Sequence, residues 1–171
     1  MRARARGVVG LCFILGVIAT PAIAVPIVDD PNGFEGIPWG TTFSQSGPFL
    51  KIEDDGRQQT YERKGASPAL GSTTVDSIRF TAFKGKFGRV TVRYSGKDTH
   101  NRLLDYLQNQ YGKLDSTPGQ IAVGPVKVYT WHGFDTEVTL RFEANVERGI
   151  IFFESRAVRD VSVEENSATV F

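Results

Sequence analysis

The chain has 171 residues, which suits one domain with a core of its own, and it carries a formal net charge of +1 and a single cysteine, Cys12. A near-neutral balance of charge without a basic run gives no electrostatic basis for binding nucleic acid, because such binding depends on neutralising phosphates. The cysteine lies in an apolar N-terminal run, so disulfides, thiolate catalysis and cysteine-ligated zinc are excluded for the rest of the chain.

Residues 1–24 have the pattern of a secretory signal peptide. Three arginines precede the apolar run Val8–Ile18, and Ala22 and Ala24 place small residues at the two positions that a signal peptidase reads. We predict cleavage after Ala24 and a periplasmic or secreted protein. The alternative is an N-terminal anchor in the inner membrane, because the uncharged segment is long enough to span a bilayer, but Pro21 and Pro26 would interrupt its helix.

The next segment, residues 25–33, contains prolines and aspartates and predicts a flexible leader. The folded domain is expected to run from residue 34 to residue 158. Thr42, followed by Gln45 three residues later, matches a capping box, so a short helix is predicted that ends at Gly47 and Pro48.

Three strands are predicted in the first half of the domain. Gln59–Arg63 is a weak candidate, whereas Val75–Phe83 and Phe87–Tyr94 alternate apolar and polar residues on either side of the turn Lys84–Lys86. This pattern indicates a half-buried antiparallel hairpin.

One long helix follows, from about Lys97 to Tyr111. Leu103 and Leu107 belong to its apolar stripe, and Gly112 stands where a C-terminal cap is expected. His100, in its first turn, is expected to be solvated.

Three further strands complete the domain as a meander, over Val126–Trp131, Glu137–Phe142 and Ile150–Arg156. The run Ile150–Phe153 does not alternate, which predicts either a central strand covered on both faces or part of a docking surface. Residues 159–171 are polar and acidic and are predicted to form a tail.

These elements predict an α+β domain, built mainly on an antiparallel sheet of about six strands, with one long and one short helix. The order of a helix and three strands occurs twice, which suggests an internal duplication of an α-β-β-β unit.

A set of aromatic, glycine and apolar positions carries a resemblance. These positions are Phe34-x-Gly36-Ile37-x-Trp39-Gly40, Ile78-x-Phe80-x-x-Phe83-Lys84-Gly85-Lys86-Phe87, Leu107-x-x-x-Tyr111-Gly112, Trp131 and Leu140-x-Phe142. Together they resemble a group of small exported bacterial proteins of unknown function that open with an F-x-G-I-x-W-G segment. The resemblance covers about residues 34–156 and implies a fold and not a reaction. In layout alone, the chain is similar to the small α+β modules of outer-membrane assembly lipoproteins and of secreted β-lactamase-inhibitory proteins.

Catalytic chemistry has one candidate, His132, which shares a turn with Asp135 and could act with a carboxylate as an acid-base pair in a periplasmic hydrolase. A turn between strands also demands Gly133 and Asp135, which favours the structural reading. The spacings of histidine-ligated zinc, of serine nucleophile motifs and of phosphate loops are missing from the sequence. We therefore expect no catalytic residue, no metal and no cofactor.

A binding role is the stronger interpretation. If the helices cover one side of the sheet, aromatic and apolar residues on the other side would form an exposed binding face, although core packing also explains them. The face is predicted to contain Tyr129, Trp131, His132, Ile150 and Phe152. The expected function is that of an exported, non-catalytic binding or envelope-associated protein, with a protein or a small apolar ligand as its partner and no nucleic acid. A further alternative is a secreted inhibitor of an envelope enzyme, which would insert the Lys84–Lys86 tip or the His132 turn.

Overall fold

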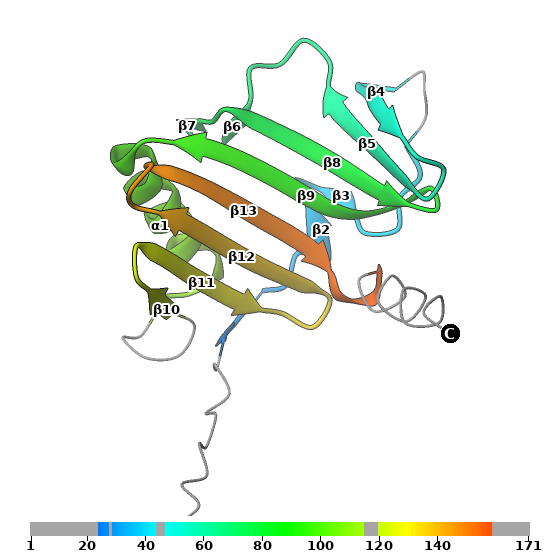
Figure 1. Ribbon diagram of the computed structural model, residues 1–171. Helices are drawn as coiled ribbons and strands as arrows, with labels where there is room; N and C mark the ends of the chain where they lie inside the picture. The colour runs from blue at the N-terminus through cyan, green and yellow to red at the C-terminus, as the bar shows by residue number, and fades with distance from the viewer. Residues whose placement is uncertain (1–23, 28, 44–46, 115–119, 159–171) are drawn as a thin grey trace, which may run out of the picture.

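The computed structural model describes residues 24–27, 29–43, 47–114 and 120–158, and it shows one large sheet with a long helix against one face (Figure 1). The fold is α+β, as predicted, but the sheet has nine strands and not about six. Its strands, in chain order, are β1 (Val25–Pro26), β4 (Phe49–Asp54), β5 (Gln58–Arg63), β8 (Ser77–Phe83), β9 (Lys86–Ser95), β10 (Gln120–Val123), β11 (Val126–His132), β12 (Thr136–Glu143) and β13 (Arg148–Ser155).

The spatial order of the strands is β1-β11-β12-β13-β9-β8-β5-β4, with β10 also paired to β11. Two meanders, β5-β8-β9 and β11-β12-β13, meet where β13 and β9 pair antiparallel. All six predicted strands are present. The three additional strands, β1, β4 and β10, lie at the two sides of the sheet, and only β1 pairs in parallel.

Two small hairpins lie outside the main sheet, β2 (Gly33–Phe34) with β3 (Ile37–Pro38), and β6 (Ala69–Leu70) with β7 (Thr73–Thr74). The predicted short helix falls partly on residues 44–46, which lie outside the described residues, and Thr41–Phe43 before them have no regular secondary structure.

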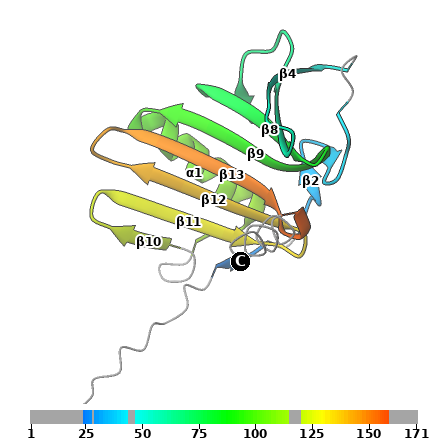
Figure 2. The same cartoon turned by 45° about the vertical axis from the view of Figure 1, so that its right-hand side comes forward.

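The long helix, α1 (Lys97–Tyr111), has the predicted bounds and lies across one face of the sheet (Figure 2). Leu103 and Leu107 are fully buried against that face. Within the described residues, no helix is long and apolar enough to cross a bilayer.

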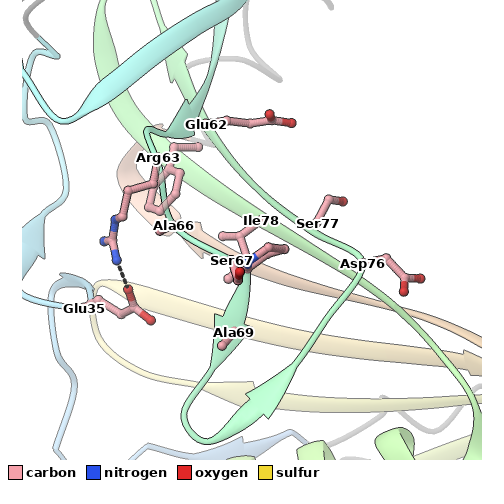
Figure 3. Close-up of a pocket in the computed structure, with 11 residues that line it drawn as sticks. Glu35, Glu62, Arg63, Ala66, Ser67, Ala69, Asp76, Ser77 and Ile78 are labelled. Carbon is pink, nitrogen blue, oxygen red and sulfur yellow. Dashed lines mark ion pairs between the residues drawn. The ribbon is translucent and has the colours of Figure 1, made fainter.

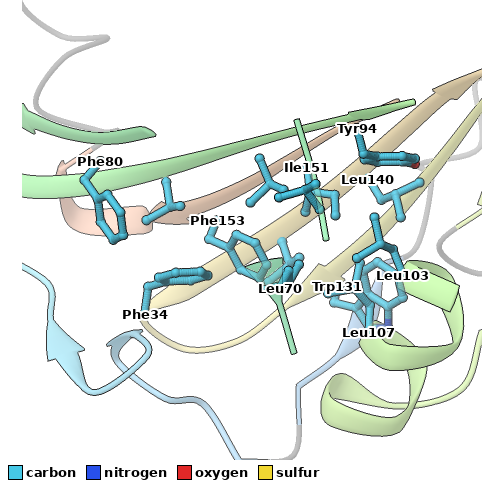
Figure 4. Close-up of a cluster of buried hydrophobic side chains, with 14 of the residues drawn as sticks. Phe34, Leu70, Phe80, Tyr94, Leu103, Leu107, Trp131, Leu140, Ile151 and Phe153 are labelled. Atoms are coloured by element: carbon cyan, nitrogen blue, oxygen red, sulfur yellow. The ribbon is translucent and has the colours of Figure 1, made fainter. Parts of the chain in front are cut away.

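The core fills the space between the sheet and the two parts of the chain that cover it, α1 and the segment around Phe34 (Figure 4). At one end, Leu103 and Leu107 of α1 pack near Trp131. At the other end, the ring of Phe34 lies 5.9 Å from that of Phe80 and 4.7 Å from that of Phe153. The face of the sheet that these layers cover is called the covered face below.

The opposite face is called the open face, because α1 lies on the other side of the sheet (Figure 2). At one end of it Val158 lies against Gly88. Side chains alternate between the two faces along each strand. In β13, Ile151 and Phe153 are buried on the covered face, while Ile150 and Phe152 are half-buried on the open face.

Of residues 25–33, predicted as a flexible leader, the described ones, 25–27 and 29–33, are part of the folded domain. Val25 and Pro26 form β1 beside the end of β11, and the backbone N–H of the buried Ile27 donates to the carbonyl of His132 at 2.8 Å. The prediction was wrong because the segment is ordered by partners about a hundred residues away, which local composition does not contain.

Asp30 fixes the same segment to the turn between β11 and β12. Its carboxylate accepts the backbone N–H groups of Asp135 at 2.6 Å and of Thr136 at 2.9 Å. Burial raises the pKa of Asp30, but hydrogen bonds from Thr136, Asn32 and Asp135 outweigh it and leave that pKa below its ordinary value. A Cβ at Gly133 would clash with the Asp30 carboxylate, so any other residue there would displace that carboxylate from its hydrogen bonds.

Candidate functional site

The five residues of the predicted binding face do not share one face. Tyr129 and Trp131 lie on the covered face with 4% and 0% of their surface exposed. The indole N–H of Trp131 donates to the carbonyl of Gly112 at 2.8 Å, which joins β11 to the end of α1. Both are core residues, so their inclusion in an exposed face was wrong.

Ile150 and Phe152 lie on the open face, in the strand that occupies the middle of the sheet. The unbroken run Ile150–Phe153 is explained by this position, because β13 has strands on both sides and presents apolar residues to both faces. Phe152 is flanked by Thr139 of β12 and Thr91 of β9 in the strand register. The part of the predicted face that remains exposed is therefore Ile150, Phe152 and His132.

Three arginines surround Ile150. Arg141 of β12 and Arg93 of β9 are its direct cross-strand neighbours, and Arg148 precedes it by two residues on the same face of β13. They border an open depression of about 500 Å³. Among the described residues, none of the three guanidinium groups makes an ion pair or a side-chain hydrogen bond.

Other arginines of the open face are paired. Arg79 lies 3.5 Å from the Glu62 carboxylate, and Arg89 makes a close ion pair with Glu154. The three arginines around Ile150 are thus a distinct group, defined here as the arginine cluster.

Two carboxylates also border the depression. Asp76 accepts the hydroxyl of Ser95 at 2.7 Å, and Glu143 lies opposite Arg148 in the register of β12 and β13. Both lie toward one end of the strands, whereas Phe152 lies in the other direction from Ile150. This arrangement could not be predicted from the sequence, because its members come from three strands and the segment before β8.

A smaller pocket of about 260 Å³ lies beside the segment 64–76 (Figure 3). Its walls include Ile78 and Phe80, and the Arg63 guanidinium beside it lies 3.0 Å from the Glu35 carboxylate. Arg63 also lies over the rings of Phe49 and Phe80, at 5.8 Å and 5.5 Å from their centroids. This arginine is therefore already paired and stacked, unlike the three arginines around Ile150.

His132 does have a carboxylate partner, but it is Glu137 and not Asp135. The imidazole Nε2 lies 2.9 Å from the Glu137 carboxylate across the β11-β12 ladder. Asp135 instead uses its backbone N–H to bind Asp30. An imidazole with a carboxylate can serve as a general base, but cross-strand pairs of this kind also occur as ordinary sheet contacts.

His100, expected to be solvated, is buried on the covered face. Its ring stacks on Phe142 at 3.9 Å, and its Nδ1 lies 2.8 Å from the Tyr94 hydroxyl. Burial, with a smaller contribution from the charge of Lys127, lowers the pKa of His100 to about 4. The helical pattern failed here because His100 shares the side of α1 that carries Leu103 and Leu107.

The tip of the β8-β9 hairpin is held by the adjacent strand. The N–H of Gly85 donates to the Gln59 side chain at 3.1 Å, and the N–H of Lys84 donates to the carbonyl of Arg57 at 2.8 Å. It is an anchored turn and not a projecting loop.

Comparison with protein-family models, with curated proteins and with solved structures finds no match. Within the part of the chain that the structure describes, no group of three or more histidine, cysteine, aspartate or glutamate residues is placed to hold a metal ion.

Proposed function

We propose that this chain is an exported, non-catalytic binding protein that holds its partner on the open face of the sheet, around Ile150 and Phe152. One observation carries the proposal. Ile150 and Phe152 lie half-exposed in the central strand, and the three arginines around Ile150 have no ionic partner among the residues that the structure describes. Arginine and aromatic residues are enriched at binding surfaces, and a cation left unpaired on a protein surface is available to a ligand.

Export is the first half of the proposal. It rests on the N-terminal arginines, the apolar run Val8–Ile18 and the small residues at Ala22 and Ala24. N-terminal sequencing of the protein from the cell envelope is expected to begin at Val25. A protein that retains Met1 and sediments with membranes would establish the anchored alternative.

Binding is the second half. Native mass spectrometry of the full exported chain, purified from its own envelope fraction, should show a bound molecule that is released on denaturation. The variant Ile150→Asn should lose it, because a polar amide replaces the apolar centre of the depression. The matched control Thr130→Asn, on the open face two strands away, should retain it. If neither the unaltered chain nor either variant carries a bound molecule, the proposal is contradicted.

A hydrolase is the second candidate, favoured by the 2.9 Å contact between His132 and Glu137. An enzyme of this kind should lose activity by about two orders of magnitude or more in His132→Gln, because general acid-base catalysis contributes that much. Retention of a bound ligand in His132→Gln, with no turnover of ester or amide substrates by the unaltered chain, supports the binding protein instead.

Kinship with small exported proteins that open with F-x-G-I-x-W-G, and the duplication of an α-β-β-β unit, remain proposals of the same kind. The duplication is supported by the two consecutive meanders, each contributing three neighbouring strands. A secreted inhibitor remains a prediction, with alanine substitutions at Lys84 and Lys86 as its test.

A further inference from the structure

The arginine cluster has a geometry that suits one anionic group. Residues opposite each other on neighbouring strands have Cβ atoms about 5 Å apart, so Arg93 and Arg141 flank Ile150 closely on both sides. Arg148 stands on the same face of β13, one pleat away. Three long side chains from three adjacent strands can therefore converge over Ile150.

The positions of the carboxylates near the arginine cluster indicate how an anionic ligand would lie along β13. Asp76 and Glu143, the two carboxylates of the depression, lie on the side of Ile150 away from Phe152. Asp76 already accepts the Ser95 hydroxyl. An apolar track leads the opposite way along β13, from Ile150 to Phe152, with Thr91 and Thr139 on its two sides. It ends at the Arg89 guanidinium, which lies 6.0 Å from the centroid of the Phe152 ring. A ligand with its anionic end at the arginines would place its remainder over Phe152. The direct cross-strand neighbours of Phe152 are the uncharged Thr91 and Thr139.

The size of the depression, about 500 Å³, falls in the range of small-molecule sites, which is roughly 300–1,000 Å³. Guanidinium groups bind carboxylate and phosphate through paired N–H donors, and these charge-assisted hydrogen bonds are stronger than neutral ones.

We infer that the depression around Ile150 binds a small soluble amphiphilic anion, a molecule with a carboxylate or phosphate group and an apolar chain. The anionic group contacts Arg93, Arg141 and Arg148, and the chain lies over Ile150 and Phe152. This inference rests on the proposed function and names the class of ligand for the same face.

Isothermal titration calorimetry on the full exported chain tests the inference with three probes: octyl phosphate, inorganic phosphate and octyl glucoside. We expect octyl phosphate to bind at least about ten-fold more tightly than either of the others, because only it satisfies both the cations and the apolar track. Equal affinity for octyl phosphate and octyl glucoside would overturn the anionic part. Equal affinity for octyl phosphate and inorganic phosphate would overturn the apolar part.

Variants assign the contacts. The triple substitution Arg93→Gln, Arg141→Gln and Arg148→Gln should reduce the affinity for octyl phosphate by about ten-fold or more. Arg79→Gln is the matched control, since Arg79 lies on the same face but is paired with Glu62, and it should bind like the unaltered chain. Phe152→Ala should lower the affinity for octyl phosphate and leave the affinity for inorganic phosphate unchanged. Thermal denaturation of each variant verifies that it is folded.

Two further outcomes separate this inference from the proposed function. If Ile150→Asn abolishes binding of octyl phosphate and the triple arginine variant does not, the binding face stands and the anionic ligand is wrong. If neither has an effect, both are wrong. The protein could instead cosediment with phosphatidylglycerol vesicles through the three arginines and fail to bind octyl phosphate. That result would mean that the arginines bind a membrane surface, and it would overturn the soluble ligand.

Discussion

The two faces of the central strand β13 have nearly the same composition and opposite roles. Ile151 and Phe153 are 0% and 1% exposed under α1 and the Phe34 segment, whereas Ile150 and Phe152, their neighbours in the chain, remain half-exposed. The difference comes from the layers placed on each side and not from the strand. Apolar character alone therefore identifies a central strand, but the covering elements decide which of its residues stabilise the fold and which are available to a ligand.

The strongest test of this comparison replaces one aromatic residue on each face. Trp131→Ala should lower the free energy of unfolding by about 3–5 kcal/mol, because it leaves a cavity and removes the hydrogen bond to the Gly112 carbonyl. Phe152→Ala should cost only about 1 kcal/mol, because its ring is already partly in water. Urea denaturation of both variants measures the difference, and equal losses would mean that the open face is structurally covered.

A second test concerns Gly149, which lies directly against the Tyr94 ring on the covered face. A Cβ at this position would lie 1.9 Å from the Tyr94 ring, which is buried and contacts His100 through its hydroxyl. Gly149→Ala should displace that ring and lower the free energy of unfolding by about 1–3 kcal/mol, the usual effect of overpacking a core. Ala144→Gly, in the exposed turn before β13, serves as a control for the loss or gain of a single methyl group. Unchanged stability in Gly149→Ala would show that the ring has room to move.

The third test concerns a pH dependence confined to the covered face. His100 has its pKa lowered to about 4 when folded, against an ordinary value of 6.5, so above pH 6.5 it is neutral in both states and its contribution to stability is complete. Between pH 6.5 and pH 4 the unfolded chain takes up a proton that the folded chain does not, and the free energy of unfolding should fall by on the order of 2 kcal/mol. Thermal melts across this range measure the slope, and His100→Gln should flatten it. A slope that survives the substitution would assign the effect to other groups.

Period-two and helical patterns in the sequence predicted the six central strands and the helix α1 correctly, because those elements are half-buried and their two sides differ in polarity. The same patterns did not predict β1 and β4. β1 has two residues, and β4 exposes five of its six residues, so neither shows a buried face.

The candidate site was only partly predictable, for a related reason. Ile150 and Phe152 were identified from an unbroken apolar run, and His132 from its turn. Assigning Tyr129 and Trp131 to the same face required knowledge of where α1 lies. The arginine cluster and the pair of His132 with Glu137 depend on strand register, which brings together residues that have no common local pattern.

The sides of the sheet limit how any partner can approach. Along β11, the outer backbone groups pair with β10 over the first part of the strand and with β1 at its end. At the other side, β4 is interrupted by a bulge between Lys51 and Glu53 and carries charged residues. Bulges and charges of this kind discourage the addition of a further strand. Recognition by β-strand addition is therefore disfavoured at the β4 side, and at the other side only the short strands β1 and β10 are left as edges, so the sheet offers a partner only short or irregular edges.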